Sequence, residues 1–158
     1  MGSVWLKNFF GLKQTQFELL QVPNPKTEHC IHVTLRCAQA GTVLGSLLGP
    51  LVVFLNSSQT RKSSSAEMRD AFTSGGINGA LIGTLVGTVM SAVTINNMNS
   101  VQLYDKCYRA RYDTDQLTFD RTCVLGAALG SLSSGSFGLV VGVDLALLIS
   151  NVLSAVRK

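Results

Sequence analysis

Four long stretches of this chain contain no charged side chain, and they constrain its fold more than any other feature of the sequence. The stretches are Cys37–Thr60, Ala71–Tyr104, Thr122–Val143 and Leu145–Val156. The whole chain has only 13 Lys and Arg and 9 Asp and Glu residues, whereas about a quarter of a typical soluble domain is charged. This distribution excludes a disordered chain, a disulfide-stapled miniprotein and most soluble enzymes. It leaves a small integral membrane protein.

The glycine content explains why the mean hydropathy of the chain, +0.31, is low for a membrane protein. Most of the 15 glycines lie inside or beside the charge-free stretches, together with many Ser, Thr and Ala residues. Small residues add little to hydropathy, but they let helix backbones approach closely in lipid, where packing drives helix association. The sequence therefore predicts a tightly packed bundle of membrane helices.

We predict an all-α integral membrane protein with four transmembrane helices within residues 31–158, because about 20 apolar residues cross the hydrocarbon core of a bilayer. The predicted spans are 34–55, 72–95, 122–137 and 139–156. Pro50 is expected to kink the first span, which membrane helices tolerate. A turn at 133–136 joins the last two spans, although one long bent helix over 122–156 is an alternative.

Residues 1–30 are predicted to form an amphipathic arm ahead of the transmembrane domain. Trp5, Phe9 and Leu12 share one face of a helix, and Lys7 lies on the opposite face. An aromatic and leucine face opposite lysine is typical of a helix that lies in the lipid headgroup region. Packing of this face on a partner protein is the alternative.

Small residues recur at every fourth position in the predicted spans. The glycines of these series are Gly41, Gly45, Gly49, Gly75, Gly79, Gly83, Gly87, Gly126, Gly130, Gly138 and Gly142. Such a series forms a shallow groove along a helix, into which another helix settles at a right-handed crossing of about −40°. We therefore predict that these glycines are helix-packing positions.

The glycine-rich spans resemble the mitochondrial Tim-type preprotein translocase (PRAT) family. The motif of that family is Arg, three residues, Asp, six residues, a small residue, Gly, three residues and Gly. This chain has Glu67, Ser74, Gly75 and Gly79 at the matching spacing. It departs from the motif because Glu replaces Asp and because Ser63 stands where the family has Arg.

The resemblance covers roughly residues 34–156, and within the family the chain looks most like the four-span accessory subunits of respiratory complex I. It implies a non-catalytic, structural subunit of the mitochondrial inner membrane that contacts other membrane subunits, lipids and neighbouring complexes. The altered motif points the same way, since a working translocase would be expected to keep it. A component of a protein translocase or a solute pore of the same family is the alternative.

The cysteines suggest a disulfide rather than a metal site. Cys30 and Cys107 flank the first two spans on the same side, so an oxidising compartment would allow a bridge between them; free or buried thiols are the alternative. His29, His32 and Cys37 lie near Cys30, but their spacing does not complete a tetrahedral site. We predict no metal.

Apart from Arg36 at the entry of the first span, Asp144 is the only charged residue inside a predicted span. An intramembrane carboxylate is a functional candidate by default. Because Asp144 is close to the predicted start of its helix, it could instead reach the interface or cap a neighbouring group. Proton translocation is disfavoured, since no second ionisable residue within the spans could relay the proton.

The basic residues at the predicted membrane surface could bind lipid headgroups. Arg36, Lys106 and Arg109 are the candidates, with cardiolipin as an anionic ligand. The charges between 105 and 121 alternate in sign, which disfavours a nucleic-acid surface and favours a protein partner or a solvated loop. We find no catalytic triad, phosphate-binding loop or dinucleotide motif, so we predict no catalytic residue, no cofactor and no small-molecule substrate.

The orientation of the termini is left open by the sequence. The side of the membrane that carries both termini collects most of the lysines and arginines, which by the positive-inside rule would be the matrix side. The family resemblance implies the intermembrane space instead.

Overall fold

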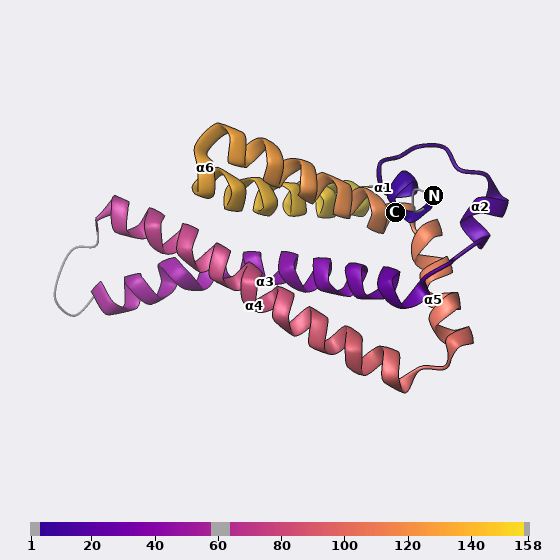
Figure 1. The fold of residues 1–158 in the computed structure, drawn as a ribbon. Helices are drawn as coiled ribbons and strands as arrows, with labels where there is room; N and C mark the ends of the chain where they lie inside the picture. Colours follow the sequence, from indigo (N-terminus) through magenta and orange to yellow (C-terminus); the bar gives the residue numbers. More distant parts are fainter. Residues whose placement is uncertain (1–3, 58–63, 157–158) are drawn as a thin grey trace.

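The structure of the chain is a computed structural model that describes residues 4–57 and 64–156. Within these ranges the chain forms six helices and no strand (Figure 1). The helices are α1 (Val4–Phe9), α2 (Gln16–Leu20), α3 (Pro25–Ser57), α4 (Ser65–Asn97), α5 (Ser100–Tyr112) and α6 (Thr114–Val156). Three of them, α3, α4 and α6, are long and apolar enough to span a membrane.

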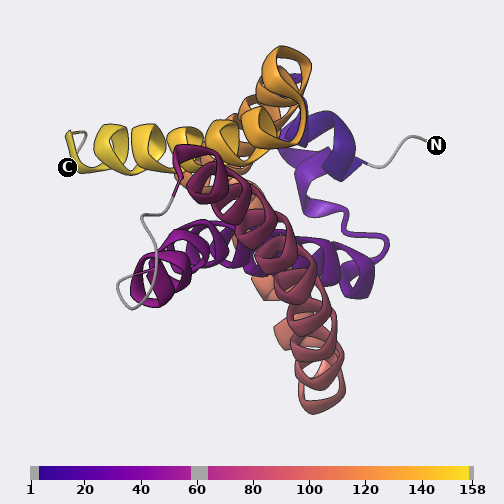
Figure 2. The same ribbon diagram turned by 90° about the vertical axis from the view of Figure 1, so that its left-hand side faces the viewer.

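The helices α3 and α4 cross each other, and α6 lies along one side of the pair (Figures 1 and 2). The first two predicted spans fall inside α3 and α4, and α3 continues through Pro50. A capping box starts α4, in which Ser64 and Glu67 satisfy each other's backbone N–H groups. Glu67, the acidic residue of the PRAT-like motif, therefore helps to start α4. Ser63 lies outside the described residues.

The helix α6 folds back on itself at Ser134 and Gly135. The two residues have non-helical backbone angles, with φ −144° and ψ 25° at Ser134 and φ 58° and ψ −136° at Gly135. The positive φ favours glycine. Figure 1 shows the resulting hairpin, whose first arm (114–133) and second arm (136–156) lie side by side. The turn lies within the predicted segment 133–136, although the predicted third span, 122–137, extends past it, and the alternative of one long bent helix is not formed.

The distribution of side chains is the reverse of that in a water-soluble protein. Large apolar side chains face outward, and Leu132 is 84% exposed. The interior contains many small and polar side chains beside a few apolar ones such as Val140, and Ser46 and Ser91 are each only 1% exposed. A large exposed apolar surface marks a site of contact with a membrane or with other proteins. The outer faces of the long helices are therefore suited to lipid.

The first helix is shorter than the sequence predicts. It ends at Phe9, and Gly11 follows with a positive φ of 77°. The N–H of Gly11 donates to the carbonyl of Asn8 (3.0 Å) and the N–H of Leu12 donates to the carbonyl of Lys7 (3.1 Å). This is the glycine-closed helix end known as a Schellman motif. Leu12 therefore lies beyond the helix, and the predicted continuous face through Leu12 is wrong.

The arm nevertheless presents apolar side chains to the outside. Phe10, Leu12 and Phe17 are all exposed, while the side chain of Trp5 lies outside the described part of the structure. Whether these side chains contact lipid or a partner protein stays a prediction.

Candidate functional site

The glycines of α3 and α4 bring the two helix backbones into direct contact. A Cβ atom built on Gly45 would lie 2.0 Å from the carbonyl oxygen of Gly75, and one built on Gly79 would lie 2.0 Å from that of Gly41. Real Cβ atoms essentially never come this close to another atom. All seven predicted packing glycines of these helices lie in this contact, namely Gly41, Gly45, Gly49, Gly75, Gly79, Gly83 and Gly87.

The remaining predicted glycines close the α6 hairpin. Gly130 faces Gly138, and Gly126 faces Gly142, again with room for a hydrogen atom but not for a Cβ. Backbones this close gain dispersion energy and weak Cα–H···O contacts along the whole interface. The period of four therefore packs one helix pair and one hairpin inside this chain.

A glycine outside these series joins the two units. Gly76 of α4 is buried, and a Cβ on it would lie 2.5 Å from Cγ1 of the buried Val140 in the second arm of α6. Gly76 faces a different neighbour from Gly75, so the four-residue period could not reveal it. The adjacent glycine pair was the available signal.

Polar side chains of α3 form a second line of contacts, toward α6. His32, Gln39 and Ser46 are spaced seven residues apart, which places them on one side of the helix after every two turns. Ser46 Oγ donates to Asp144 Oδ2 (2.8 Å) and Gln39 Nε2 donates to Asp120 Oδ1 (3.2 Å). We call these five residues, His32, Gln39, Ser46, Asp120 and Asp144, the polar seam.

Asp144 lies deeper in the bundle than its position in the sequence indicates. Its partner Ser46 is near the middle of the first predicted span, so the interpretation that Asp144 reaches the interface is not supported. Its second carboxylate oxygen, Oδ1, is buried and accepts no hydrogen bond. Val43, between Gln39 and Ser46, packs on an apolar cluster that includes Cys123 and Leu147. This cluster separates the two carboxylate contacts of the seam.

Asp120 is the functional candidate that the sequence analysis missed. The residue is only 2% exposed, although it belongs to a run of alternating charges that predicted a solvated loop or a partner surface. The structure extends α6 to Thr114, and Leu117, Asp120 and Cys123 then share the buried face of one helix. The three-residue spacing of these positions was the signal that could have found it.

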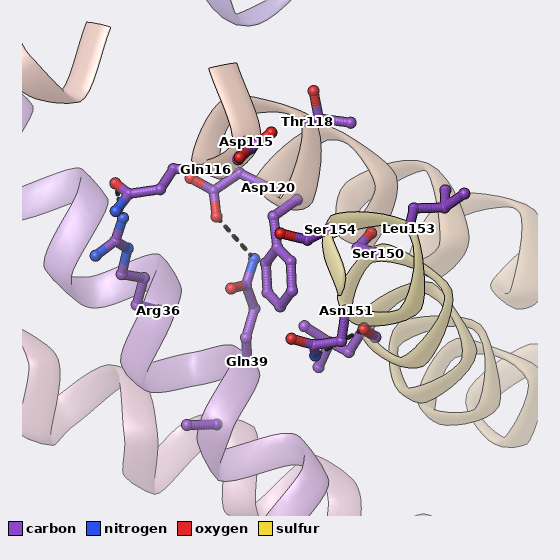
Figure 3. Close-up of a pocket in the computed structure, with 13 residues that line it drawn as sticks. Arg36, Gln39, Asp115, Gln116, Thr118, Asp120, Ser150, Asn151, Leu153 and Ser154 are labelled. Carbon is purple, nitrogen blue, oxygen red and sulfur yellow. Dashed lines mark hydrogen bonds between the residues drawn. The ribbon is translucent and has the colours of Figure 1, made fainter. Parts of the chain in front are cut away.

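A cavity of about 430 Å³ lies beside Asp120, between α3 and both arms of α6 (Figure 3). Its lining from α3 includes Arg36 and Gln39, and its lining from the second arm includes Leu147 and Leu153. Asp120 Oδ2 is buried and accepts no hydrogen bond; His32 Nδ1 lies 3.8 Å away from it. The cavity therefore has at one wall a carboxylate with one oxygen that accepts no hydrogen bond, and apolar side chains at another.

Arg111 of α5 holds the N-terminal arm against the long helices. The side chain of Arg111 is 1% exposed and forms a two-point ion pair with Glu28 at the start of α3, with Nε 3.0 Å from Glu28 Oε2. Its Nη1 also donates to the carbonyls of Leu19 (2.9 Å) and Gln21 (3.0 Å). The alternating charges of the sequence predict a surface position for Arg111, because its buried partners lie more than 80 residues away.

The arm has a second attachment near α1. Arg121 donates to the carbonyl of Asn8, and the side-chain amide of Asn8 donates to the carbonyl of Arg111 (3.3 Å). The arm is thus held on the helical domain by two arginines at one end of the bundle.

The three predicted headgroup residues occupy different surroundings. Arg36 donates to Gln116 and lines the cavity. Arg109 is 78% exposed and pairs with Asp105 on the same face of α5 (2.9 Å), and Lys106 is exposed. Neither Lys106 nor Arg109 lines the cavity, so the structure does not assemble the three into one site.

The cysteines that the sequence analysis considered for a disulfide are free thiols in the structure. Ser91 Oγ donates to the sulfur of Cys30 (3.2 Å), whereas the thiol of Cys107 donates to the carbonyl of Pro25 (3.1 Å). The two sulfurs thus have separate partners. Among the described residues, no group of three or more His, Cys, Asp or Glu side chains is placed to hold a metal ion.

We expect Cys107 to react slowly with thiol reagents. Burial, followed by the nearby charge of Glu28, raises the pKa of the Cys107 thiol to about 11. At pH 8 the group is therefore protonated and unreactive, and iodoacetamide should modify it about a hundredfold more slowly than an exposed cysteine. Mass spectrometry of the modified peptides measures the rates, and the same protein denatured in detergent is the control. Rapid modification of Cys107, or a peptide that links Cys30 to Cys107, would contradict the structure.

Comparison with known proteins places nearly the whole chain in one family. The family described as "Protein of unknown function (DUF1757)" matches residues 5–153. The match begins within α1 and ends in the second arm of α6, so it includes the N-terminal arm as well as the long helices. No curated protein matches the chain.

Proposed function

We propose that this chain, which belongs to the DUF1757 family, is a structural, non-catalytic subunit of a large membrane complex, namely an accessory subunit of respiratory complex I in the mitochondrial inner membrane. The observation that carries the proposal is that the glycine grooves and the outward apolar faces of the long helices make different contacts. The glycine grooves are used inside the chain. The outward faces of the long helices keep large apolar side chains for lipid and for neighbouring subunits.

In this proposal the chain crosses the membrane four times, through α3, α4 and the two arms of α6. The hairpin at Ser134 and Gly135 supports this, because each arm is about 20 residues long and could span the hydrocarbon core. In Figure 1, α1 and the end of α6 lie at the same end of the molecule, as an even number of crossings requires. Phe10 and Phe17 of the arm would then lie at the level of the lipid headgroups.

The PRAT resemblance supports the location and the partner. The small residue and glycines of the motif fall in the first half of α4, where Gly75 and Gly79 touch the backbone of α3. These glycines of the motif pack the second predicted span on the first.

Migration of the native protein tests the proposal. Mitochondria solubilised in mild detergent are separated on a native gel, and the protein is detected beside NADH dehydrogenase activity. We expect the protein to run with that activity. Migration with presequence receptors, or alone, would refute the assignment to complex I.

The alternative is a translocase component or solute pore of the same family, and the polar seam favours it. Ser46 and Asp144 meet in the interior of the bundle, and one oxygen of Asp144 accepts no hydrogen bond. Ionisable residues inside membrane proteins often mark transport pathways. Purified protein that conducts ions in a lipid bilayer, with Asp144→Asn changing the conductance, would establish this alternative.

A further inference from the structure

We propose that the cavity beside Asp120 binds the headgroup of a phospholipid that carries a primary ammonium, such as an ethanolamine phospholipid. The ammonium would lie against Asp120 and the phosphate near Arg36. This inference rests on the proposed membrane location of the helices, but it does not depend on the assignment to complex I.

Asp120 provides the ammonium site. Its side chain is 3% exposed, and Gln39 Nε2 donates to only one of its two oxygens (3.2 Å). The other oxygen, Oδ2, is buried without a hydrogen bond, and His32 Nδ1 is beyond hydrogen-bond distance at 3.8 Å. This contact is an ion-pair distance only, and a buried carboxylate oxygen that accepts no hydrogen bond is costly; a ligand that donates one would remove that cost. Asp120 is among the residues that line the cavity.

The charges around the cavity favour a zwitterion over a purely anionic lipid. One cationic side chain, Arg36, and two acidic side chains, Asp115 and Asp120, line it. Arg36 already donates to Gln116, and both side chains line the cavity (Figure 3). A doubly charged anion such as cardiolipin would bring its phosphates close to two carboxylates. An ethanolamine headgroup instead pairs its ammonium with the carboxylates and its single phosphate with Arg36.

The place of the cavity in the fold suits a lipid rather than a free amine. Arg36 lies at the start of the first predicted span, and Leu153 lies near the end of the last one, so the cavity is at the expected headgroup level. The apolar side chains of Phe119, Leu147 and Leu153 form part of its wall. They provide a surface for the glycerol and the first methylenes of the acyl chains.

The chemistry of Asp120 predicts discrimination between two common headgroups. An ethanolamine ammonium has three N–H donors, whereas the trimethylammonium of choline has none. Only the first can donate a hydrogen bond to the carboxylate of Asp120. A site built to bond a donor rejects the analogue that lacks it, because the buried acceptor is then left without a partner.

Native mass spectrometry of the full-length protein in detergent measures this preference directly. Ethanolamine and choline phospholipids with identical acyl chains, and cardiolipin, are added separately. We expect the ethanolamine lipid to bind about tenfold or more tightly than the choline lipid, as one hydrogen bond to a charged group provides. Cardiolipin should bind no more tightly than the ethanolamine lipid.

Two variants test whether Asp120 is the residue that causes the headgroup preference. Asp120→Asn keeps an acceptor for Gln39 but removes the charge, and we expect it to bind both headgroups equally. Asp105→Asn removes an exposed carboxylate that does not line the cavity, and it should keep the wild-type preference. Circular dichroism and gel filtration show whether each variant is folded.

Several results would overturn the proposal. With the wild-type protein, equal binding of the ethanolamine and choline lipids would overturn it, and so would a preference for cardiolipin. With folded Asp120→Asn, an unchanged preference for ethanolamine would also overturn it. Failure of the protein to fractionate with membranes would instead refute the membrane location, whereas membrane-bound protein without headgroup preference would refute only the lipid site.

Discussion

Gly79→Leu is expected to separate α3 from α4 and to prevent the chain from reaching its folded state. A Cβ at this position would lie 2.0 Å from the carbonyl oxygen of Gly41 and 3.0 Å from Cα of Gly45. Both are backbone atoms, so no side chain can rotate away, and one helix must move along the whole interface. Overpacking in cores where side chains can adjust costs about 1–3 kcal/mol. We expect a larger loss here, and even Gly79→Ala should be destabilising.

The measurement is thermal unfolding of the purified protein in detergent, followed by circular dichroism. Ala92→Leu is the matched control, because Ala92 is on the exposed face of the same helix and should accept a leucine with little change. Gly83→Leu should behave like Gly79→Leu, since its Cβ would lie 2.1 Å from the carbonyl oxygen of Cys37. If both glycine variants melt at the wild-type temperature, the backbone contact between α3 and α4 does not exist.

Arg111→Met is expected to release the N-terminal arm and to destabilise the domain by about 3–5 kcal/mol, the usual cost of removing one partner of a buried ion pair. The substitution leaves Glu28 charged and 9% exposed without its partner. It also removes the donor to the carbonyls of Leu19 and Gln21, which tie α2 to α5. Limited proteolysis near α2, together with thermal unfolding, measures both effects.

The control is Arg109→Met, two residues earlier on the same helix. Arg109 is exposed and pairs with Asp105 on the surface, so its removal should cost less than about 1 kcal/mol. The double variant Arg111→Met with Glu28→Met should recover part of the lost stability, because it no longer buries an unpaired charge. Equal effects of the two arginine substitutions would show that Arg111 does not fasten the arm.

The pattern of glycines and charge-free stretches was enough to predict how the helices approach one another. The reason is that close packing in lipid needs small residues at a fixed period, and this period is visible in the sequence. Gly75 and Gly79 therefore lie in a helix contact, as the pattern predicts, although the pattern did not identify α3 as the partner. The turn at Ser134 and Gly135 was visible for a similar reason, because only a short polar segment interrupts the apolar run.

The buried polar residues could not be predicted in the same way. Whether Asp120 and Arg111 face solvent or the interior depends on which distant elements cover them, and those partners, Gln39 and Glu28, lie more than 80 residues away. A local run of alternating charges has the same appearance in both cases. The end of α1 was missed for a local reason. The positive φ of Gly11 ends the helix, although the apolar pattern of the sequence continues to Leu12.

Depletion of the protein from cells tests the central claim, a structural role in complex I, most directly. The amounts of assembled complex I and its NADH dehydrogenase activity are followed on native gels, with import of a presequence-bearing protein measured in the same mitochondria. We expect loss of assembled complex I, restored by the wild-type chain, while import continues. Fully assembled complex I after depletion, with or without a defect in import, would contradict it.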